Sequence, residues 1–322
     1  MLAETTTRTP VRRLAVLGAL AVAAVAAYLL LDVRGSWTFA LRLRGWTILT
    51  MLLVGYAVAV STVLFQTVTT NRILTPSIMG FDALYALIQT VFVAALGAAS
   101  LTRVPVAAQF ALEVGLMIGF SLLLFRRLFG AHVRDLHLLV LVGIVLGVLF
   151  RSLSSFVQRL LDPNEFSVLQ DRLFATFSGV DRTLLAVSVL AVAVATAALW
   201  RMRTTFDVLA LGRDTAVGLG VAHRRAVLRI LVVVAVLVSV STALVGPITF
   251  FGLLVANLAY RVVGTDRHAA TLPAAVLLAV VALAGGQAVL QHGLGLDSTL
   301  SVVVEFLGGL VFLVLLIRRV RT

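Results

Sequence analysis

The chain has 322 residues, a mean hydropathy of +1.10 and a formal net charge of +12. Hydrophobic residues make up 61% of it and charged residues only 12%, which excludes a soluble domain, whose apolar share is about half. All 26 basic residues are arginine, so a phosphate-binding loop of the G-x-x-x-x-G-K-[ST] kind is excluded because it needs a lysine. The composition predicts an all-α polytopic membrane protein that does not hydrolyse ATP by that route.

Several other kinds of site are also disfavoured. The chain has no cysteine, which excludes disulfides and thiolate metal sites. The five histidines lie near predicted helix ends without an H-E-x-x-H pair, so an interfacial role is favoured for each and no metal site is expected. The arginines fall at the ends of apolar runs, where they anchor helices to lipid headgroups, and no nucleic-acid partner is expected. Without a convergent catalytic set, the chain is predicted not to be an enzyme.

Apolar runs of membrane-spanning length recur from one end of the chain to the other. The first follows Arg8, Arg12 and Arg13; its length and the lack of a clean cleavage site favour a membrane helix over a signal peptide. Together the runs predict a single transmembrane permease domain over residues 1–322 with ten spans. They cover about 14–31, 46–69, 79–99, 105–125, 137–155, 183–200, 226–245, 247–263, 272–291 and 300–317.

The arginines fix a predicted topology for these spans. With the amino terminus inside, 18 of them fall on the inner side and 8 on the outer side. The positive-inside rule therefore predicts both termini in the cytoplasm of a bacterium, with the chain in its plasma (inner) membrane. The long outer segment contains a helix predicted at about 163–177, after Asp162, that lies at the interface. It could cover a translocation mouth, contact a partner, or simply pack on the lipid surface.

Two polar turns interrupt the apolar pattern. From Gln66 to Gly80 the sequence indicates a helix end, a proline-directed turn and a new helix start. Pro247, directly after Gly246, divides a long apolar run into two spans. Inside the spans Glu113 is the clearest acidic residue. It is either a functional carboxylate or one packed against a Gln or Ser of a neighbouring helix.

A third polar stretch, Phe206 to Val221, lies between two long apolar runs and is flanked by arginines, which predicts that it faces the cytoplasm. Its spacing predicts one or two short helices broken by glycines. Within it, Leu211 to Val221 reads LGRDTAVGLGV and fits the pattern L-G-x-[DE]-x-A-x-x-L-G-V. This resembles the cytoplasmic loop of the iron-siderophore and cobalamin importer permeases, the FecCD-type family of ABC transporters.

Two further motifs resemble the same family, in the same order. QTVTTNRILTPSIMG from Gln66 is similar to Q-x-x-x-R-N-P-L-A-x-P-x-x-L-G. GPITFFGLLVANLAYRVVGTDRH from Gly246 is similar to G-x-I-x-F-V-G-L-x-x-P-H-x-x-R-x-x-x-G-x-D-H-R, with the family's closing His-Arg reversed as Arg267-His268. The resemblance covers about residues 40–317. It implies the type II ABC importer fold of the cobalamin permeases, with ten transmembrane helices.

The resemblance assigns roles to individual residues. Short coupling helices at about 206–221 would sit in a cleft of a cytoplasmic ATPase subunit, through Asp207, Leu211, Gly212, Arg213, Asp214, Ala216, Leu219 and Gly220. The helix turns and translocation path would use Gln66, Asn71, Pro76, Gly80, Gly246, Pro247 and Gly252. The family's outer arginines help to receive an extracytoplasmic binding protein, a role that would fall here to Arg44, with Arg42, Arg103 or Arg159 as additional candidates, since Thr47 replaces the other arginine.

The implied function is that of a permease subunit for ferric siderophore uptake, with alternating access driven by a separate ATPase. The chain would carry no cofactor of its own, because ATP is used by that partner. It would pair with a second homologous permease, either non-identical or identical. The alternatives are cobalamin or haem as the substrate, or an ion-coupled secondary transporter that would need intramembrane acids as coupling sites.

Overall fold

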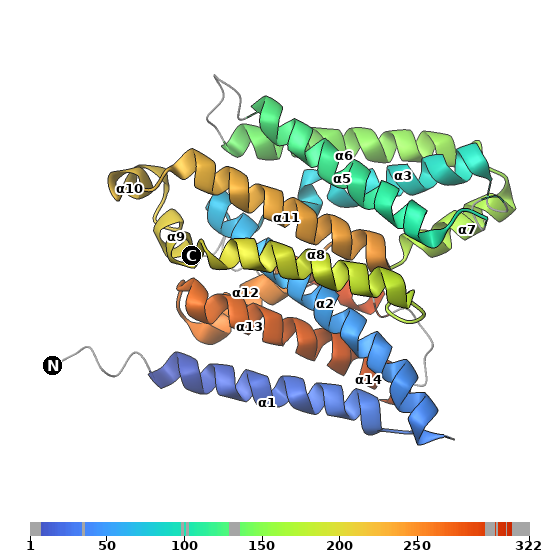
Figure 1. Ribbon diagram of the computed structural model, residues 1–322, viewed down its shortest axis with the longest axis horizontal. Helices are drawn as coiled ribbons and strands as arrows, with labels where there is room; N and C mark the ends of the chain where they lie inside the picture. Colours follow the sequence, from blue (N-terminus) through green and yellow to red (C-terminus); the bar gives the residue numbers. More distant parts are fainter. Residues whose placement is uncertain are drawn as a thin grey trace.

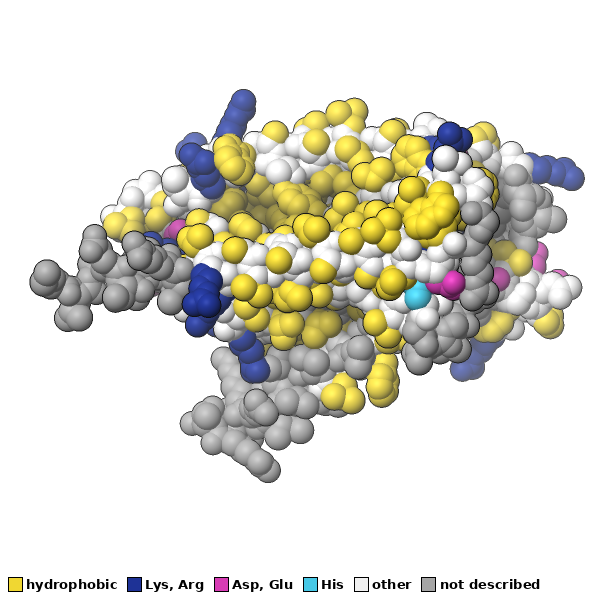
Figure 2. Space-filling view, turned by 90° about the horizontal axis from the view of Figure 1, so that it is seen from below, with side chains coloured by type: hydrophobic (Ala, Val, Ile, Leu, Met, Phe, Trp, Pro, Cys, Tyr) yellow, Lys and Arg dark blue, Asp and Glu magenta, His cyan; other side chains and the backbone are white. Residues whose placement is uncertain are grey.

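The structure is a computed structural model that describes residues 8–33, 36–97, 100, 103–128, 136–293, 300, 302–306 and 308–310. Every regular element in these residues is helical, and the long helices lie side by side in one bundle (Figure 1). On the face shown in Figure 2, hydrophobic side chains cover the middle of the molecule and arginines lie towards its ends. This distribution fits a bundle with its middle in lipid.

Seven helices are long and apolar enough to cross a membrane, judged by length and composition. They are α1 (Arg8–Leu30), α2 (Trp37–Thr69), α5 (Val106–Leu128), α6 (Leu136–Gln158), α8 (Arg182–Trp200), α11 (His223–Val245) and the continuous run His268–His292. That run consists of α13 (His268–Val280), two π-helical segments, η2 (Val281–Gly285) and η3 (Val289–Gly293), and α14 (Gly286–Ala288) between them. Two apolar helices are shorter, α3 (Phe81–Leu96) and α12 (Phe251–Val263).

The predicted spans agree closely with these helices in order and position. The coarse prediction of an all-α polytopic membrane protein is confirmed, with seven spans of full length. The last predicted span, 300–317, lies mostly outside the described residues. The two short helices are explained below by the turns that precede them.

Helices α2 and α11 form the centre of the bundle. In α2, 72% of the most apolar window is buried and in α11 67%, against 17% in α1. The two helices pack against each other, and α2 also packs against α13. Residues 58–64 (VAVSTVL) and 238–244 (VSVSTAL) are similar in sequence and lie on these two central helices. Small residues such as Ala57, Ala59 and Ala235 are fully buried there and let the helices pack closely.

Each short helix follows a tight turn that is itself inside the bundle. The 3₁₀ turn η1 (Pro76–Met79) leads into α3 through Gly80, whose φ is +91°. A Cβ on Gly80 would lie 3.0 Å from the Cα of Gly147 in α6. Gly246, with φ +98°, turns the chain before α12, and its Cβ would lie 3.0 Å from the Cα of Ala175. Glycine is required at both turns by the backbone angle and by the close approach of a second backbone.

The outer helix is shorter than predicted. Helix α7 (Pro163–Leu173) begins where expected, but Phe174 is extended, so residues 174–177 are not helical. The Thr176 N–H donates to the Val245 carbonyl at 2.8 Å, which fixes this extended segment against the end of α11. Phe177 is buried in the main core rather than on a helix face. The predicted end of this helix at about 177 is therefore wrong, because α7 ends at Leu173.

Candidate functional site

The stretch 206–221 forms two short helices, α9 (Arg203–Leu209) and α10 (Arg213–Gly218), at the end of the bundle where α8 ends and α11 begins (Figure 1). Gly212 joins them with φ +92° and ψ 169°, a region open almost only to glycine. Gly220 follows α10 with φ +82°. A Cβ at either glycine would meet no atom within 4 Å, so the backbone angle alone requires glycine there.

The two short helices differ in burial. Phe206 and Leu209 of α9 are buried at 3% and 2% exposure. Around α10 only Ala216 is buried, whereas Leu211, Val217 and Leu219 are exposed at 61%, 54% and 62%. Arg213 and Asp214 of α10 and Gly220 are exposed as well. The stretch thus presents apolar and charged side chains outward on a polar loop, where no lipid is expected to cover them.

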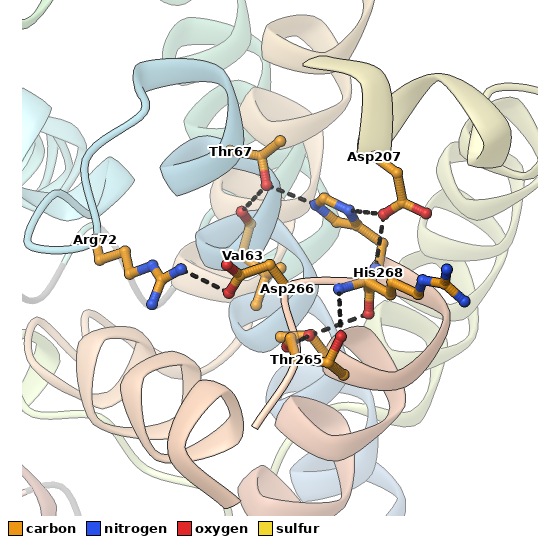
Figure 3. Close-up of polar contacts among 9 residues, drawn as sticks. Val63, Thr67, Arg72, Asp207, Thr265, Asp266 and His268 are labelled. Atoms are coloured by element: carbon orange, nitrogen blue, oxygen red, sulfur yellow. Dashed lines mark hydrogen bonds and ion pairs between the residues drawn. The ribbon is translucent and has the colours of Figure 1, made fainter. Parts of the chain in front are cut away.

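Asp207 of α9 faces inward to α13 (Figure 3). Its Oδ1 accepts the backbone N–H of His268 at 2.8 Å and lies 2.7 Å from Nδ1 of the same histidine. Partial burial opposes ionisation of Asp207, but these hydrogen bonds outweigh it and the pKa of its carboxyl lies below the ordinary value. The carboxylate also satisfies a free N–H at the start of α13, where a negative charge is favoured.

His268 is the functional candidate that the sequence alone did not single out. Its side chain is buried, and Nε2 lies 2.7 Å from the Thr67 Oγ1 in the last turns of α2. The Phe206 ring packs against the imidazole with ring centroids 5.6 Å apart. A cleft of about 610 Å³ opens beside these residues, lined also by Arg72, Tyr260 and Asp266. One feature of the sequence could have pointed to His268. The third motif ends in Asp266-Arg267-His268, so that His268 stands where the family has arginine.

The first polar turn is held by its own motif residues. The Gln66 amide donates to the Arg72 carbonyl at 2.8 Å, and the Asn71 side chain accepts the Ile73 N–H at 3.0 Å. Asn257, which replaces a histidine of the family pattern, also donates to the Arg72 carbonyl at 3.1 Å. Pro76 starts η1 at the position where proline needs no N–H partner. These residues shape the backbone turn between α2 and α3.

The second turn lies against the centre of α2. Gly252 is packed so tightly that a Cβ there would overlap the Thr62 hydroxyl. Half-buried Pro247 follows α11, which ends at Val245, and has no backbone N–H with which to continue the helix. Both turns border a cavity of about 20 Å³, room for about one water molecule. Of the candidate turn residues, Pro76, Gly246 and Gly252 line this cavity, whereas Gly80 packs against Gly147 of α6.

Asp82 and Glu305 lie near the ends of predicted spans, yet both contact Thr249 inside the bundle. Asp82 Oδ2 accepts the Thr249 hydroxyl at 2.9 Å, and Glu305 Oε1 accepts the Thr249 N–H at 3.3 Å. Thr249 thus connects the start of α3 with the segment around Glu305. The acids lie inside because the two short helices both begin inside the bundle, which the apolar pattern did not reveal.

Glu113 packs against a glutamine of a neighbouring helix, one of the two interpretations that the sequence allowed. Gln89 of α3 donates to Glu113 Oε1 at 2.8 Å. The side-chain oxygen of Gln89 accepts a hydrogen bond from Arg172 of α7 at 3.4 Å, and Arg172 also donates to Gln109 at 3.2 Å. The carboxylate belongs to a polar network between α3, α5 and α7.

The candidate docking arginines have different surroundings. Arg44 donates to the carbonyls of Tyr28, Leu29 and Leu31 at 3.1, 3.1 and 2.7 Å, so it caps the carboxyl end of α1. Arg42 is exposed on the same stretch of α2. Sequence reasoning could not distinguish the two, because the carbonyls that hold Arg44 belong to a different helix.

These features define the class of the protein: an α-helical, polytopic membrane protein with a structured segment that projects from one end of its bundle. The chain matches the model of the FecCD transport family over residues 12–318. It is 44% identical over 306 residues to the petrobactin import system permease protein YclO of Bacillus subtilis (strain 168), which covers 95% of this chain and 97% of YclO. It is 35% identical over 272 residues to the petrobactin import system permease protein FatC of Bacillus anthracis, covering 84% and 77% of the two chains.

One solved structure, of a metal-chelate type ABC transporter in an inward-facing conformation, has the same fold. It superposes with a TM-score of 0.81 at 21% identity and covers 95% of this chain and 99% of that one.

The chain belongs to the FecCD transport family. It is a multi-pass membrane protein of a bacterial ABC importer and serves as a permease subunit, which is not catalytic. ATP is hydrolysed by a partner ATPase, in agreement with the missing phosphate-binding loop. The predicted family is confirmed, and the alternative of an ion-coupled secondary transporter is wrong.

Proposed function

We propose that this chain is the permease subunit of an importer for a ferric siderophore, with petrobactin as the first candidate. The observation that carries the proposal is the 44% identity to YclO over nearly the full length of both chains. FatC, which is also named for petrobactin import, supports the same substrate at a lower identity of 35%. Cobalamin and haem, the other substrates considered from the sequence, have no comparable support.

In the proposed mechanism, the ATPase contacts the segment from 206 to 221. ATP binding closes the ATPase subunits, and their movement displaces α9 and α10, which reorients the helices around the central passage and alternates access to it. The support is the exposure of Leu211, Val217 and Leu219 beside the charged Arg213 and Asp214. Apolar anchors surrounded by polar groups are typical of protein interfaces.

The complete importer contains more than this chain. We assign it two ATPase copies, an extracytoplasmic siderophore-binding protein and a second, homologous permease that is not identical to this one. Arg42 is the better candidate for contact with acidic residues of the binding protein, because it is exposed. Arg44 supports that contact by fixing the end of α1 beneath it. Charge reversal at Arg42 is expected to weaken docking, and unchanged uptake would contradict the assignment.

The proposed topology has ten spans in the inner membrane, with both termini and the 206–221 segment in the cytoplasm. Because the chain contains no cysteine, a single introduced cysteine is a unique reporter. Leu211→Cys is expected to resist a membrane-impermeant thiol reagent in intact cells and to react after lysis. Leu160→Cys, between α6 and α7, is expected to react in intact cells. The opposite pattern would reverse the topology.

The substrate is tested by uptake of radioactive iron in the native bacterium after deletion of this gene. Iron bound to petrobactin is expected to enter only when the gene is restored. Iron bound to enterobactin, haem iron and labelled cobalamin serve as the competing substrates in separate assays. If petrobactin uptake survives the deletion while one of the others is lost, the assignment passes to that substrate.

A further inference from the structure

One buried histidine links α9 to two membrane helices that are distant in sequence. His268 contacts Asp207 of α9 through both its backbone N–H and its ring Nδ1, at 2.8 and 2.7 Å. Its other ring nitrogen contacts Thr67 of α2 at 2.7 Å (Figure 3). Since His268 is itself the first residue of α13, the three side chains connect α9, α13 and α2.

The connection is stiff because its centre is buried. The His268 side chain is only 5% exposed, and the neighbouring Phe206 is 3% exposed. A buried ring nitrogen that loses its partner is left without water to replace it, so the contact resists opening. Thr67 is held in turn by a 2.9 Å bond to the Val63 carbonyl of its own helix. Displacement of α9 therefore acts directly on α13 and α2.

The covalent chain cannot supply this connection. The segment of α9 and α10 is joined through the backbone to α8 and α11 only. Asp207 and His268 are 61 residues apart, and Thr67 and His268 are 201 apart. Without these contacts a push on α9 would reach α2 and α13 only through general packing.

A second ion pair in the same cleft provides a comparison. Arg72 and Asp266 lie 2.6 Å apart, but their side chains are 53% and 66% exposed, so solvent screens the pair. Both residues belong to turns between membrane helices, and neither belongs to α9. This pair resembles the first in its length and its place in the cleft but does not link α9 to any helix.

We propose that Asp207, His268 and Thr67 are positioning residues that pass movement of α9 to α13 and α2, and so set how much substrate is transported for each ATP hydrolysed. The inference rests on the proposed role of the 206–221 segment as the ATPase contact. It adds a specific path by which that contact reaches the helices of the translocation passage.

The test uses the complete importer, with both permeases, the ATPases and the loaded binding protein, reconstituted in proteoliposomes. Both ATP hydrolysis and iron-siderophore transport are measured, and their ratio is compared. Asp207→Ala and Thr67→Val should keep ATPase association and hydrolysis but lower the ratio by about fivefold, the weight of one buried hydrogen bond. Asp266→Ala, which removes a carboxylate from the same cleft, should leave the ratio unchanged.

Conservative variants separate coupling from simple destabilisation. Asp207→Asn keeps an oxygen acceptor and Thr67→Ser keeps the hydroxyl, so each should restore most of the ratio. A misfolded permease would lower hydrolysis and transport together and leave the ratio of the folded fraction unchanged. A normal ratio in Asp207→Ala and Thr67→Val, or an equal fall in Asp266→Ala, would overturn the inference.

The same preparation distinguishes this failure from failure of the proposed function. If Leu211→Asp with Leu219→Asp abolishes ATPase association while the Asp207 and Thr67 variants couple normally, the segment is the ATPase contact and only the path is wrong. If that double variant binds the ATPase normally, the segment is not the contact, and both proposals fail together.

Discussion

Helices α9 and α10 are neighbours in sequence and of similar length, yet they differ in how deeply they are buried. Helix α9 buries Phe206 and Leu209 and binds α13 through Asp207. Helix α10 buries only Ala216 and leaves the apolar side chains around it exposed. The comparison teaches that a single polar segment contains one half that is packed into the bundle and one half whose apolar side chains stay exposed.

The difference follows from the glycine between them. Gly212 adopts an angle that other residues avoid, so the chain turns sharply after α9, and the apolar side of α10 does not face the bundle. A continuous helix would have placed Phe206 and Val217 on a common, mostly buried side or a common exposed one. Substitutions can therefore change one half while leaving the other intact.

The largest effect is expected on the exposed half. Leu211→Asp with Leu219→Asp places two charges in a contact that would bury both side chains, and the loss of two anchors should lower affinity for the ATPase by roughly 30-fold or more. Co-purification of the ATPase with the permease measures the change. Thr204→Asp, an exposed polar position on α9, adds a charge outside the apolar contact. It should leave co-purification intact. An equal loss of co-purification in this control would show that the exposed apolar side chains are not specifically required for ATPase binding.

The buried half should respond through stability instead. Phe206→Ala removes a buried ring that packs on His268, and truncations of this kind cost about 3 to 5 kcal/mol. The thermal midpoint of the detergent-solubilised permease should fall by several degrees. Val217→Ala on α10 removes exposed apolar atoms and should leave the midpoint unchanged. Equal midpoints for the two variants would contradict the division between the helices.

The sequence predicted this segment because its signals are local. Glycine and charge between two apolar runs indicate a structured loop, and the motif from Leu211 to Val221 supplied the family. The helix boundaries were likewise close to those observed, because the length of an apolar run and the residues that end it are encoded locally.

The sequence could not reveal contacts between distant elements. Asp207 was assigned to the ATPase contact by motif position, whereas its carboxylate faces His268, 61 residues away. Arg44 was assigned to docking, but its guanidinium is engaged by carbonyls of α1. Asp82 lies near the start of a predicted span, but its carboxylate accepts the Thr249 hydroxyl inside the bundle. In each case the residue that makes the contact lies on another element. Neither the residue spacing nor the hydropathy of the local sequence indicates such a contact.

A smaller effect is expected from the joint between the halves. Gly212→Ala forces a side chain into a backbone region with φ +92°, which costs on the order of 1 to 3 kcal/mol, although a Cβ would meet no atom there. The strain should reorient α10 and weaken ATPase association without a large change in the thermal midpoint. Gly218→Ala lies in α10 with equally open surroundings and no positive φ, so it should be neutral or slightly stabilising. If both substitutions weaken association equally, the angle at Gly212 is not what matters.

The smallest effect concerns acid. The pKa of Asp207 lies below its ordinary value in the folded protein, so its carboxylate stabilises the contact with His268 above the ordinary pKa of aspartate, about 3.9. That contribution is lost as the pH falls through the lower, folded-state pKa. Its magnitude is limited because the Asp207 side chain is 47% exposed and solvent screens the charge.

Thermal midpoints of the wild type and Asp207→Asn should therefore differ by a small amount at pH 5, begin to converge below about pH 4, and become equal only once the pH has fallen through the lower, folded-state pKa of Asp207. Asp266→Asn, in the exposed pair with Arg72, should differ less from the wild type, because that carboxylate contacts no buried group. A difference between wild type and Asp207→Asn that grows on acidification would reverse the sign of the argument. It would mean that the ionised carboxylate destabilises the folded protein at the contact that joins α9 to the bundle.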